Sequence, residues 1–217
     1  MTRYAAMWSG GKDSALAVTR ARAAGLGVDT LLSFHDAATR RVRFHATRVE
    51  LIEAQAGAIG ARLRAFGTSP DRFDATLRDA LAALRDEGFA GVIFGDIHLA
   101  DVRAWYEERV RAAGLEHVEP LWGEPPAGLV AEFVAGGGRA VITCCETAKL
   151  GEAWLGRVID EDFPRDIAVL SIDPAGENGE YHSFAFAGPL FRRAVGWRAG
   201  ELRRENGFVQ LDLLGVP

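Results

Sequence analysis

One glycine-rich loop limits the folds open to this chain of 217 residues more than any other feature. Tyr4–Trp8 is apolar enough for a buried strand, and Ser9–Ser14 then reads SGGKDS. Ser14–Ala24 places apolar residues at helical spacing and ends before Gly25. A loop between a strand and a helix start offers free backbone N–H groups and the positive end of the helix dipole, so the sequence predicts an anion site there.

The strand-then-helix pattern recurs through the first half of the chain. Further strands are predicted at Val28–Phe34, Arg62–Gly67 and Gly91–Gly95, and further helices at Thr47–Ile59, Asp71–Glu87 and Ala100–Ala113, the last with Asp101 as its N-cap. This order predicts an α/β fold of the Rossmann-like class with a doubly wound parallel sheet. The ligand crevice of such a sheet lies at the carboxyl ends of its strands.

The alternation of predicted strands and helices ends after Pro120. Trp122–Pro126 is rich in helix and strand breakers. The later predicted elements are a short helix at Ala127–Val134 and strands at Arg139–Cys144, Tyr181–Phe186, Leu190–Trp197 and Gly207–Leu213. We therefore predict two domains: a domain at residues 1–121 that carries the anion site, and a smaller α+β domain at residues 122–217.

Composition excludes several classes of protein. An apolar fraction of 48% is ample for a core, and no apolar run approaches the length of a membrane span, so we expect a cytoplasmic protein. The net charge of −5 makes nucleic acid an unlikely partner. The only cysteines, Cys144 and Cys145, are adjacent and cannot form a C-x-x-C pair, so we expect two buried strand residues. Oligomeric state stays open, a homo-oligomer included.

The loop residues suit a bound phosphate. Gly10 and Gly11 allow the backbone to approach phosphate oxygens, while Ser9 and Ser14 offer hydroxyl donors. Lys12 supplies positive charge, and it is one of only two lysines in a chain that otherwise uses arginine. A compact ammonium suits a point contact with phosphate, although biased codon usage would also explain the excess of arginine.

Asp13 separates this loop from the common ATPase loop. The Walker A pattern places Ser or Thr after its lysine, and this chain has Asp13 after Lys12. A carboxylate beside phosphates is repulsive unless a divalent cation lies between them, so we expect Mg²⁺ at Asp13. The alternative is a glycine turn capped by Asp13 or Ser14, with Lys12 in solvent.

At these residues the chain resembles the PP-loop ATP pyrophosphatases of the adenine-nucleotide α-hydrolase fold, whose signature is SGG-x-[DS]-S after the first strand. The resemblance implies that the loop holds the pyrophosphate portion of ATP and that ATP is cut between its α and β phosphates. Enzymes of this kind adenylate an oxygen of the substrate, release pyrophosphate, and let a nitrogen or sulfur nucleophile displace AMP.

A closer resemblance, over most of the chain, is to the diphthine–ammonia ligase branch, and within it to bacterial-type relatives. It rests on separated motifs in the expected order: Phe44-His45 with Arg48 and LIEAQAGAIG, FGDI at 94–97, PLW at 120–122, ENGEYH at 177–182 and GPLF at 188–191. Eukaryotic and archaeal ligases carry EGGE, an aromatic residue and Glu where this chain reads ENGEYH. We therefore expect specificity to differ at Asn178 and His182. The resemblance also implies that the domain at residues 1–121 binds ATP and that the domain at residues 122–217 recognises the substrate.

These motifs give a set of expected site residues. Catalysis is assigned to Lys12, Asp13, His45, Asp96, Glu177 and Glu180; nucleotide binding to Ser9, Gly10, Gly11, Lys12, Asp13, Ser14, Phe34, His45 and Gly95; substrate binding to Asn178, Tyr181 and His182; and Mg²⁺ to Asp13 and Asp96.

Each role has a plainer alternative. Asp96 follows a buried strand, where it binds Mg²⁺, orients the nucleophile or merely caps a helix. His45 stabilises phosphate charge or is a surface loop residue. Glu177 and Glu180 converge on an amine as acceptors or base, or are solvated turn carboxylates. On the helix at 100–113, an i,i+4 pair of Arg103 with Glu107, and Arg109 nearby, form a solvated face.

The leading hypothesis is an ATP-dependent ligase that adenylates a carboxylate and forms an amide with ammonia or an amine. ATP and Mg²⁺ are the expected cofactors, and the acceptor is not readable from the sequence. One alternative is a PP-loop tRNA-modifying enzyme, which the acidic charge and adjacent cysteines disfavour. The other is a sensor that binds ATP without turnover.

Overall fold

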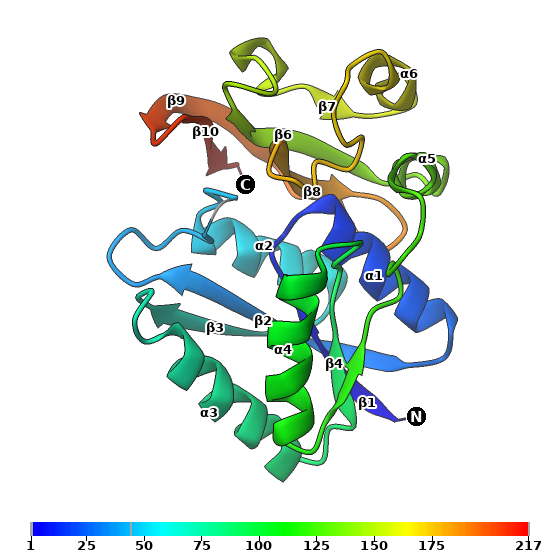
Figure 1. The fold of residues 1–217 in the computed structure, drawn as a ribbon, viewed down its shortest axis with the longest axis vertical. Helices are drawn as coiled ribbons and strands as arrows, with labels where there is room; N and C mark the ends of the chain where they lie inside the picture. Colours follow the sequence, from blue (N-terminus) through cyan, green and yellow to red (C-terminus); the bar gives the residue numbers. More distant parts are fainter. Residues whose placement is uncertain (1, 44, 217) are drawn as a thin grey trace.

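The first half of the chain forms a parallel sheet. The computed structural model describes residues 2–43 and 45–216, so Phe44 of the predicted FH motif lies outside the described residues. The strands lie in the order β3-β2-β1-β4-β5, and all adjacent pairs are parallel (Figure 1). Their bounds are β1 (Arg3–Met7), β2 (Gly27–Asp36), β3 (Arg62–Thr68), β4 (Gly91–Ile93) and β5 (Glu116–Val118).

Helices cover both faces of this sheet, which confirms the predicted doubly wound fold. They are α1 (Lys12–Ala23), α2 (Val49–Ile59), α3 (Phe73–Asp86) and α4 (Ala100–Ala112). Successive side chains of a strand point to opposite faces. Tyr4, Ala6 and Trp8 accordingly enter the core cluster that includes α1 and α2, and Ala5 enters the one that includes α3 and α4.

Two local predictions in this half are wrong. Strand β5 was not predicted, because its three residues are partly polar and too few to show a period. Asp101 is not an N-cap, because α4 already begins at Ala100 and Leu99 occupies the capping position.

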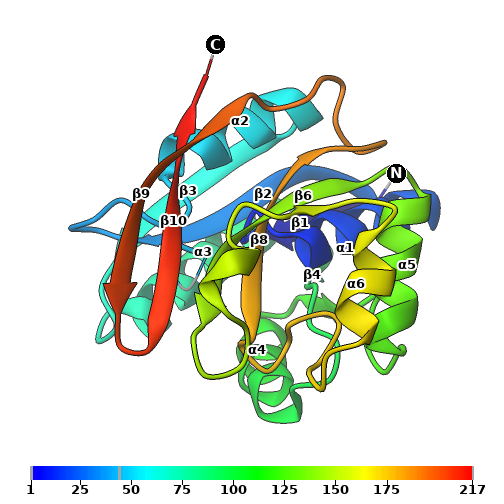
Figure 2. The same cartoon turned by 90° about the horizontal axis from the view of Figure 1, so that it is seen from above.

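The second half of the chain forms an antiparallel sheet with short helices. Its strands are β6 (Arg139–Glu146), β7 (Val158–Ile159), β8 (Tyr181–Ala187), β9 (Trp197–Glu205) and β10 (Phe208–Gly215), and its helical segments are α5 (Pro126–Ala135), η1 (Glu152–Trp154) and α6 (Phe163–Ala168). Strand β6 is central: β8 pairs along one edge, while β7 and β10 share the other. Figure 2 shows β6, β8, β9 and β10 from above. A smaller α+β unit is therefore confirmed as the second part of the fold.

The predicted strand at Leu190–Trp197 is wrong, because β9 begins only at Trp197. The segment before it crosses over α2 instead of pairing in a sheet. The Arg192 N–H donates to the Ala58 carbonyl at 2.8 Å, and the Val195 N–H donates to the Phe186 carbonyl at 2.7 Å. Its apolar residues therefore reflect burial against a helix and not membership of a strand.

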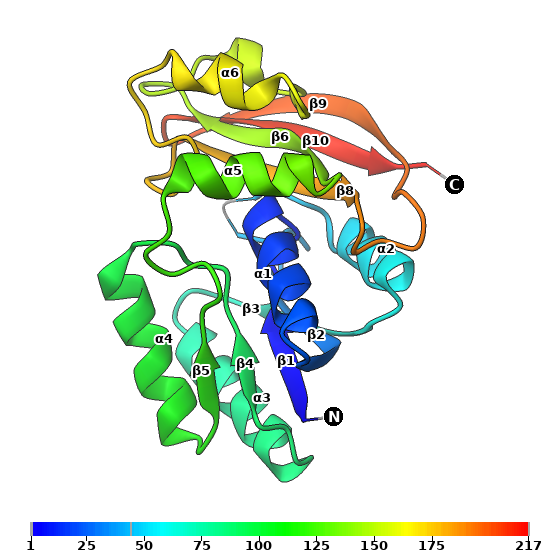
Figure 3. The ribbon, with the colours of Figure 1, turned by 90° about the vertical axis from the view of Figure 1, so that its right-hand side faces the viewer.

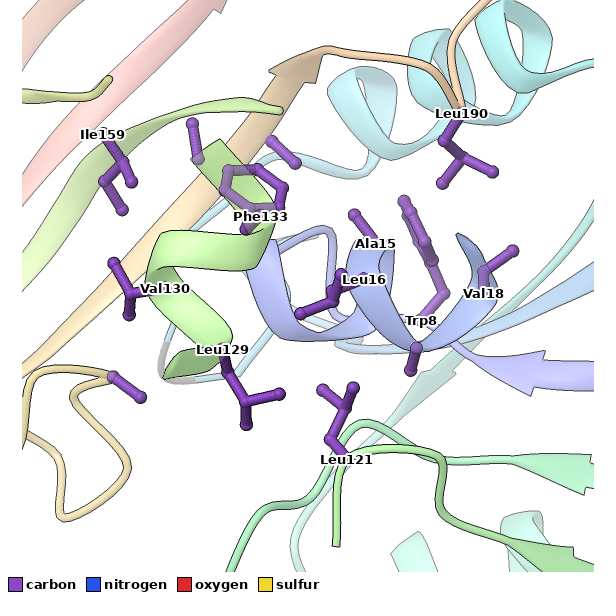
Figure 4. Packing of buried hydrophobic residues seen from close by; sticks show 14 of the residues in the cluster. Trp8, Ala15, Leu16, Val18, Leu121, Leu129, Val130, Phe133, Ile159 and Leu190 are labelled. Atoms are coloured by element: carbon purple, nitrogen blue, oxygen red, sulfur yellow. The ribbon is translucent and has the colours of Figure 1, made fainter. Parts of the chain in front are cut away.

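One hydrophobic core joins the two halves. Helices α1 and α2 lie between the parallel sheet and the second sheet, and α5 lies beside α1 (Figure 3). Figure 4 shows Leu16 of α1 facing Leu129 and Val130 of α5, and all belong to the same buried cluster as Trp8 and Ile159. The halves share buried apolar surface, so we expect them to unfold together. The predicted boundary at residue 121/122 stays a prediction; β5 ends at Val118 and α5 begins at Pro126.

A buried ion pair also joins the halves. Asp212 on β10 accepts hydrogen bonds from Arg41 Nη1 at 2.8 Å and from Arg48 Nε and Nη2 at 2.9 and 2.6 Å. Burial works against the charged carboxylate, but the two guanidinium groups outweigh it and lower the pKa of Asp212 to about 2. The ion pair anchors the segment before α2 to the second sheet.

The two cysteines lie on β6 as expected. Both are buried and unpaired, and burial raises the pKa of Cys144 to about 11 and of Cys145 to about 12. Among the helices that the structure describes, none is long and apolar enough to span a membrane.

Candidate active site

A cavity of about 460 Å³ lies at the carboxyl ends of β1 to β4, where the fold predicts a ligand crevice. The parallel sheet contributes residues that follow each of these four strands, and the second half contributes Ala175–Glu177 and the start of β8. The predicted site residues that line it are Ser9, Lys12, Asp13, Ser14, Phe34, His45, Gly95, Asp96, Glu177, Tyr181 and His182. Most of the predicted site is therefore brought together at one place.

The phosphate loop is preformed. Helix α1 begins at Lys12, and its N-cap, Gly11, offers no side-chain cap. Ser9 Oγ accepts the Gly11 N–H at 3.2 Å and donates to Ser14 Oγ at 3.3 Å, while Ser14 Oγ donates to the Gly11 carbonyl at 3.0 Å. The two hydroxyls bond to each other and to the backbone of the loop, so they help to define its shape.

Gly11 is needed because other parts of the chain press against it. A Cβ atom there would lie 2.9 Å from His45 Cε1 and 3.2 Å from the Ser183 carbonyl. The residue was predicted to allow close approach to phosphate; in the structure it allows close approach of His45 and β8. The loop is thus enclosed by segments that lie far from it in sequence.

Lys12 is buried, which excludes the alternative that it lies in solvent. Its Nζ donates to Asp13 Oδ2 at 2.9 Å and to the Ala175 carbonyl, and lies 4.9 Å from the centre of the Tyr181 ring. Burial disfavours the ammonium, but Asp13, Tyr181 and Glu177 outweigh it and raise the pKa of Lys12. Lys12 is therefore cationic at the wall of the cavity.

Four carboxylates line the same space, those of Asp13, Asp36, Asp96 and Glu177. Burial raises the pKa of Asp96 to about 6, and the charge of Asp13 adds to the rise. Burial, followed by the charge of Asp13, raises the pKa of Glu177 to about 7, although the Ile97 N–H donates to Glu177 Oε1 at 3.0 Å. Asp96 does not cap α4, whose N-cap is Leu99. The cavity thus brings several carboxylates together with two strongly basic residues, Lys12 and Arg43.

Asp13 and Asp96 fit a magnesium ion. They offer oxygen ligands on the phosphate loop and after the end of β4. Burial is the main cause of the raised pKa of Asp96, and a cation would relieve the repulsion from Asp13 that adds to it. Mg²⁺ commonly takes one or two protein carboxylates and completes its shell with phosphate oxygens and water. Within residues 2–43 and 45–216 no three His, Cys, Asp or Glu side chains form a metal site on their own, so the protein would hold Mg²⁺ together with a nucleotide.

Two histidines form another part of the wall. The ring centres of His45 and His182 lie 4.7 Å apart, and His45 Nδ1 lies 3.2 Å from the Ser183 carbonyl. Burial lowers the pKa of His45, and burial together with the charges of His45 and Lys12 lowers the pKa of His182 well below its ordinary value. Since a carbonyl only accepts hydrogen bonds, the neutral His45 ring has its proton on Nδ1 and an acceptor at Nε2.

Glu177 and Glu180 do not converge as predicted. Glu180 is absent from the described cavity wall, and its Oε1 accepts the Asp173 N–H at 3.2 Å. Asn178 is absent from that wall too, and its carbonyl accepts Lys149 Nζ at 2.8 Å. The turn at Gly179, with a positive φ of 87°, separates the two glutamates. Glu177 lines the cavity, while Glu180 stabilises the loop through its hydrogen bond with the Asp173 N–H.

The predicted pairing on α4 is also wrong. Glu107 pairs with Arg111 at 2.6 Å, and Arg103 pairs with Glu119 at 3.0 Å. Glu119 is buried directly after β5, a strand that was not predicted. The Arg109 side chain is largely buried instead of solvated.

Several site residues were missed by sequence reasoning. Ser183 Oγ accepts the Lys12 N–H at 3.2 Å, and Ser183 lines the cavity. The walls also include His35, Asp36, Thr68, Ser69, Pro70, Phe73, Leu99, Val102 and Tyr106. Several of these residues lie at or just after the ends of β2 and β3. The polar ones among them directly follow predicted parallel strands, and that position is the sequence signal that would have identified them.

Two family models match consecutive parts of the chain. A model described as the diphthamide synthase N-terminal domain matches residues 2–117, and one described as the diphthamide synthase C-terminal domain matches residues 126–212. Comparison with curated proteins gave no match.

Solved structures show weaker likeness. The chain is 13% identical to a predicted subunit of tRNA methyltransferase from Methanocaldococcus jannaschii, with a TM-score of 0.48 over 87% of this chain and 98% of that one. It is 16% identical to the U34-tRNA thiolase NcsA from Methanococcus maripaludis with its 4Fe–4S cluster, with a TM-score of 0.36 over 55% of this chain and 51% of that one. These scores carry no argument about activity.

Proposed function

The chain belongs to the diphthamide synthase family, and from this membership and the site geometry we propose that it is an ATP-dependent amide ligase. It adenylates a substrate carboxylate, releases pyrophosphate and joins the acyl group to ammonia or an amine. The observation that carries the proposal is the cavity itself, which is lined by residues of the phosphate loop, the cationic Lys12 and four carboxylates.

In the first step, a carboxylate oxygen of the substrate attacks the α-phosphorus of ATP and the bond to the pyrophosphate oxygen breaks. Lys12 is proposed to stabilise the negative charge that grows on the leaving pyrophosphate, because it is a buried cation at the cavity wall and a preorganised cation stabilises such charge most in a site that excludes water. The hydroxyls of Ser9 and Ser14 line the cavity at the start of α1, and we propose that they turn from their bonds within the loop to the phosphates when the nucleotide binds.

Asp13 and Asp96 are the residues that would hold Mg²⁺ with the nucleotide. When bound, the ion would neutralise phosphate charge that the single lysine leaves uncompensated. This assignment would explain why a carboxylate, Asp13, follows Lys12 in a loop that binds phosphates.

In the second step, the nitrogen nucleophile attacks the acyl carbon, the bond between that carbon and the AMP oxygen breaks, and the nitrogen loses a proton. Glu177 is proposed as the acceptor of that proton, because it faces the cavity and its pKa of about 7 allows it to take up and release protons near neutral pH. The acidic wall also favours the binding of ammonium or a protonated amine, which loses one proton to become the nucleophile before it attacks and a second proton, to Glu177, afterwards.

His45 is proposed to assist at the phosphates. With Nδ1 held by the Ser183 carbonyl, the ring donates from Nε2 only when it is doubly protonated. A bound triphosphate favours that imidazolium through its charge. Phe34 and Gly95, which line the cavity, are proposed to contact the nucleoside, and Tyr181 and His182 the acceptor.

The alternatives have less support. A thiolation reaction needs an accessible thiolate, and both cysteines are buried with raised pKa values. A sensor would bind ATP without turnover. Such a protein has no use for a carboxylate like Glu177, whose pKa of about 7 suits proton transfer near neutral pH.

The test is the identity of the products. The protein is incubated with ATP, Mg²⁺, ammonium and a panel of carboxylates, and nucleotides are separated by chromatography. We expect carboxylate-dependent AMP and pyrophosphate. ADP and phosphate as products would refute the proposal, and tight ATP binding with no AMP across the panel would favour a sensor.

A further inference from the structure

Gln55 is a buried polar side chain on a face of α2 that otherwise packs apolar residues. Its Nε2 donates to the Gly10 carbonyl at 2.9 Å and to the Ala185 carbonyl at 2.6 Å, while its Oε1 accepts Trp8 Nε1 at 2.9 Å. One amide therefore contacts the residue after β1, the phosphate loop and β8. No role follows from the loop motif for a residue this far along the chain.

The bond to Gly10 fixes the direction of the Gly10–Gly11 peptide. The Gly10 carbonyl accepts from Gln55 and also from the Ala185 N–H at 2.8 Å. In a trans peptide the carbonyl and the following N–H point in opposite directions, so the Gly11 N–H faces away from Gln55. It donates to Ser9 Oγ, and Ser9 lines the cavity.

This peptide needs to be held. Gly10 has a φ of +84°, and a peptide between two glycines meets little steric resistance to rotation. A Cβ atom on Gly10 would lie 2.8 Å from Gln55 Oε1 and 2.7 Å from Ile52 Cδ1. Gln55 thus packs directly on the loop that it orients.

We propose that Gln55 is the positioning residue of the phosphate loop. It keeps the Gly11 N–H directed to Ser9 Oγ, and so holds the Ser9 hydroxyl at the cavity wall, where that hydroxyl donates to the pyrophosphate portion of ATP. By binding Gly10 and Ala185 together, it also makes this orientation depend on β8. The inference rests on the proposed function, because it assumes that the loop binds ATP.

The test compares Gln55→Met, which keeps the chain length but removes all three hydrogen bonds, with the matched control Tyr4→Phe. Tyr4 lies near the start of β1, the strand whose other end leads into the phosphate loop, and its hydroxyl donates to Glu116 Oε2. Hydrogen exchange of residues 8–14 and 183–187 is measured in each protein without nucleotide. Calorimetry then gives the affinity for ATP and for pyrophosphate.

We expect Gln55→Met to exchange faster in both segments and to lose about tenfold or more in affinity for ATP and pyrophosphate, the loss of one charge-assisted hydrogen bond. Tyr4→Phe should change neither quantity. If the effect came only from a looser core, Gln55→Met and Tyr4→Phe would show similar changes in hydrogen exchange and in affinity. If Gln55→Met does not fold, Gln55→Asn, whose amide is one methylene shorter, should show the same two changes.

Unchanged exchange in both segments would overturn the inference. Faster exchange with the affinity of the unmodified protein would overturn it too, because the orientation of the loop would then not govern binding. If the unmodified protein binds neither ATP nor pyrophosphate, the proposed function is refuted, and the exchange measurement alone decides whether Gln55 holds the loop.

Discussion

Lys12 is the residue on which the proposed phosphate chemistry most depends. Replacement with Ala removes the cation next to the leaving pyrophosphate, so we expect AMP formation to fall about 100- to 1000-fold. The matched control is Lys149→Ala, since Lys149 is the only other lysine and does not line the described cavity. Steady-state AMP release in both variants makes the comparison, and equal rates would contradict the role of Lys12.

Glu177 and Glu180 lie on opposite sides of the turn at Gly179, and of the two only Glu177 lines the described cavity. Glu177→Gln keeps the bond from the Ile97 N–H but cannot accept a proton, so amide formation should slow about 100-fold or more while pyrophosphate release in the first turnover persists. Glu180→Gln keeps the bond from Asp173 and should leave both rates unchanged. Rapid-quench analysis resolves the two steps; equal slowing of both by Glu177→Gln would remove its assignment to the second step.

At the scale of elements, the loop between α6 and β8 is held by both lysines of the chain. Lys12 donates to the Ala175 carbonyl and Lys149 to the Asn178 carbonyl, and Lys149 also pairs with Glu146 at 2.7 Å. Lys149→Ala frees the outer side of the loop, so we expect the KM for the acceptor to rise less than about tenfold with the KM for ATP unchanged. A rise in the KM for ATP alone would place the loop at the nucleotide instead.

At the scale of the whole molecule, the ion pair at Asp212 couples the two halves. Asp212→Asn leaves Arg41 buried without its charge partner, which costs about 3–5 kcal/mol in the free energy of unfolding. Glu50→Gln breaks an exposed pair with Arg40 and should cost less than about 1 kcal/mol. Urea unfolding at pH 7 measures both, and similar losses would contradict the structural role of Asp212.

The same pair predicts a pH dependence. The folded pKa of Asp212 of about 2 lies below its ordinary value of about 3.9, so its contribution is complete above pH 4 and is lost as pH falls towards 2. The difference in unfolding free energy between the unmodified protein and Asp212→Asn should therefore narrow over that range. A difference that stays constant from pH 5 to pH 2.5 would contradict the coupling.

Local patterns were enough to predict most of the fold. The parallel sheet was predictable because each buried strand is a short apolar run and each helix carries apolar residues at helical spacing. Strands β5 and β7 escaped because three and two residues show no period. The segment 190–196 was misassigned because burial against a helix and burial in a sheet select the same apolar residues.

The site was predictable only in its local parts. SGGKDS follows the end of β1, so its position needed no tertiary information. The contacts of Lys12 with Ala175, of Gly10 with Gln55 and of the Lys12 N–H with Ser183 join segments 45 or more residues apart. Such contacts depend on how the second sheet packs on α1 and α2, which no single-sequence period reports.

The measurement that most directly tests the account follows the oxygen atoms of the acceptor. A carboxylate found to support turnover is labelled with ¹⁸O, and the AMP released is analysed by mass spectrometry. Attack of that carboxylate on the α-phosphorus predicts AMP carrying one ¹⁸O atom and unlabelled pyrophosphate. Unlabelled AMP, or label in inorganic phosphate, would show that the carboxylate is not adenylated and would contradict the central claim.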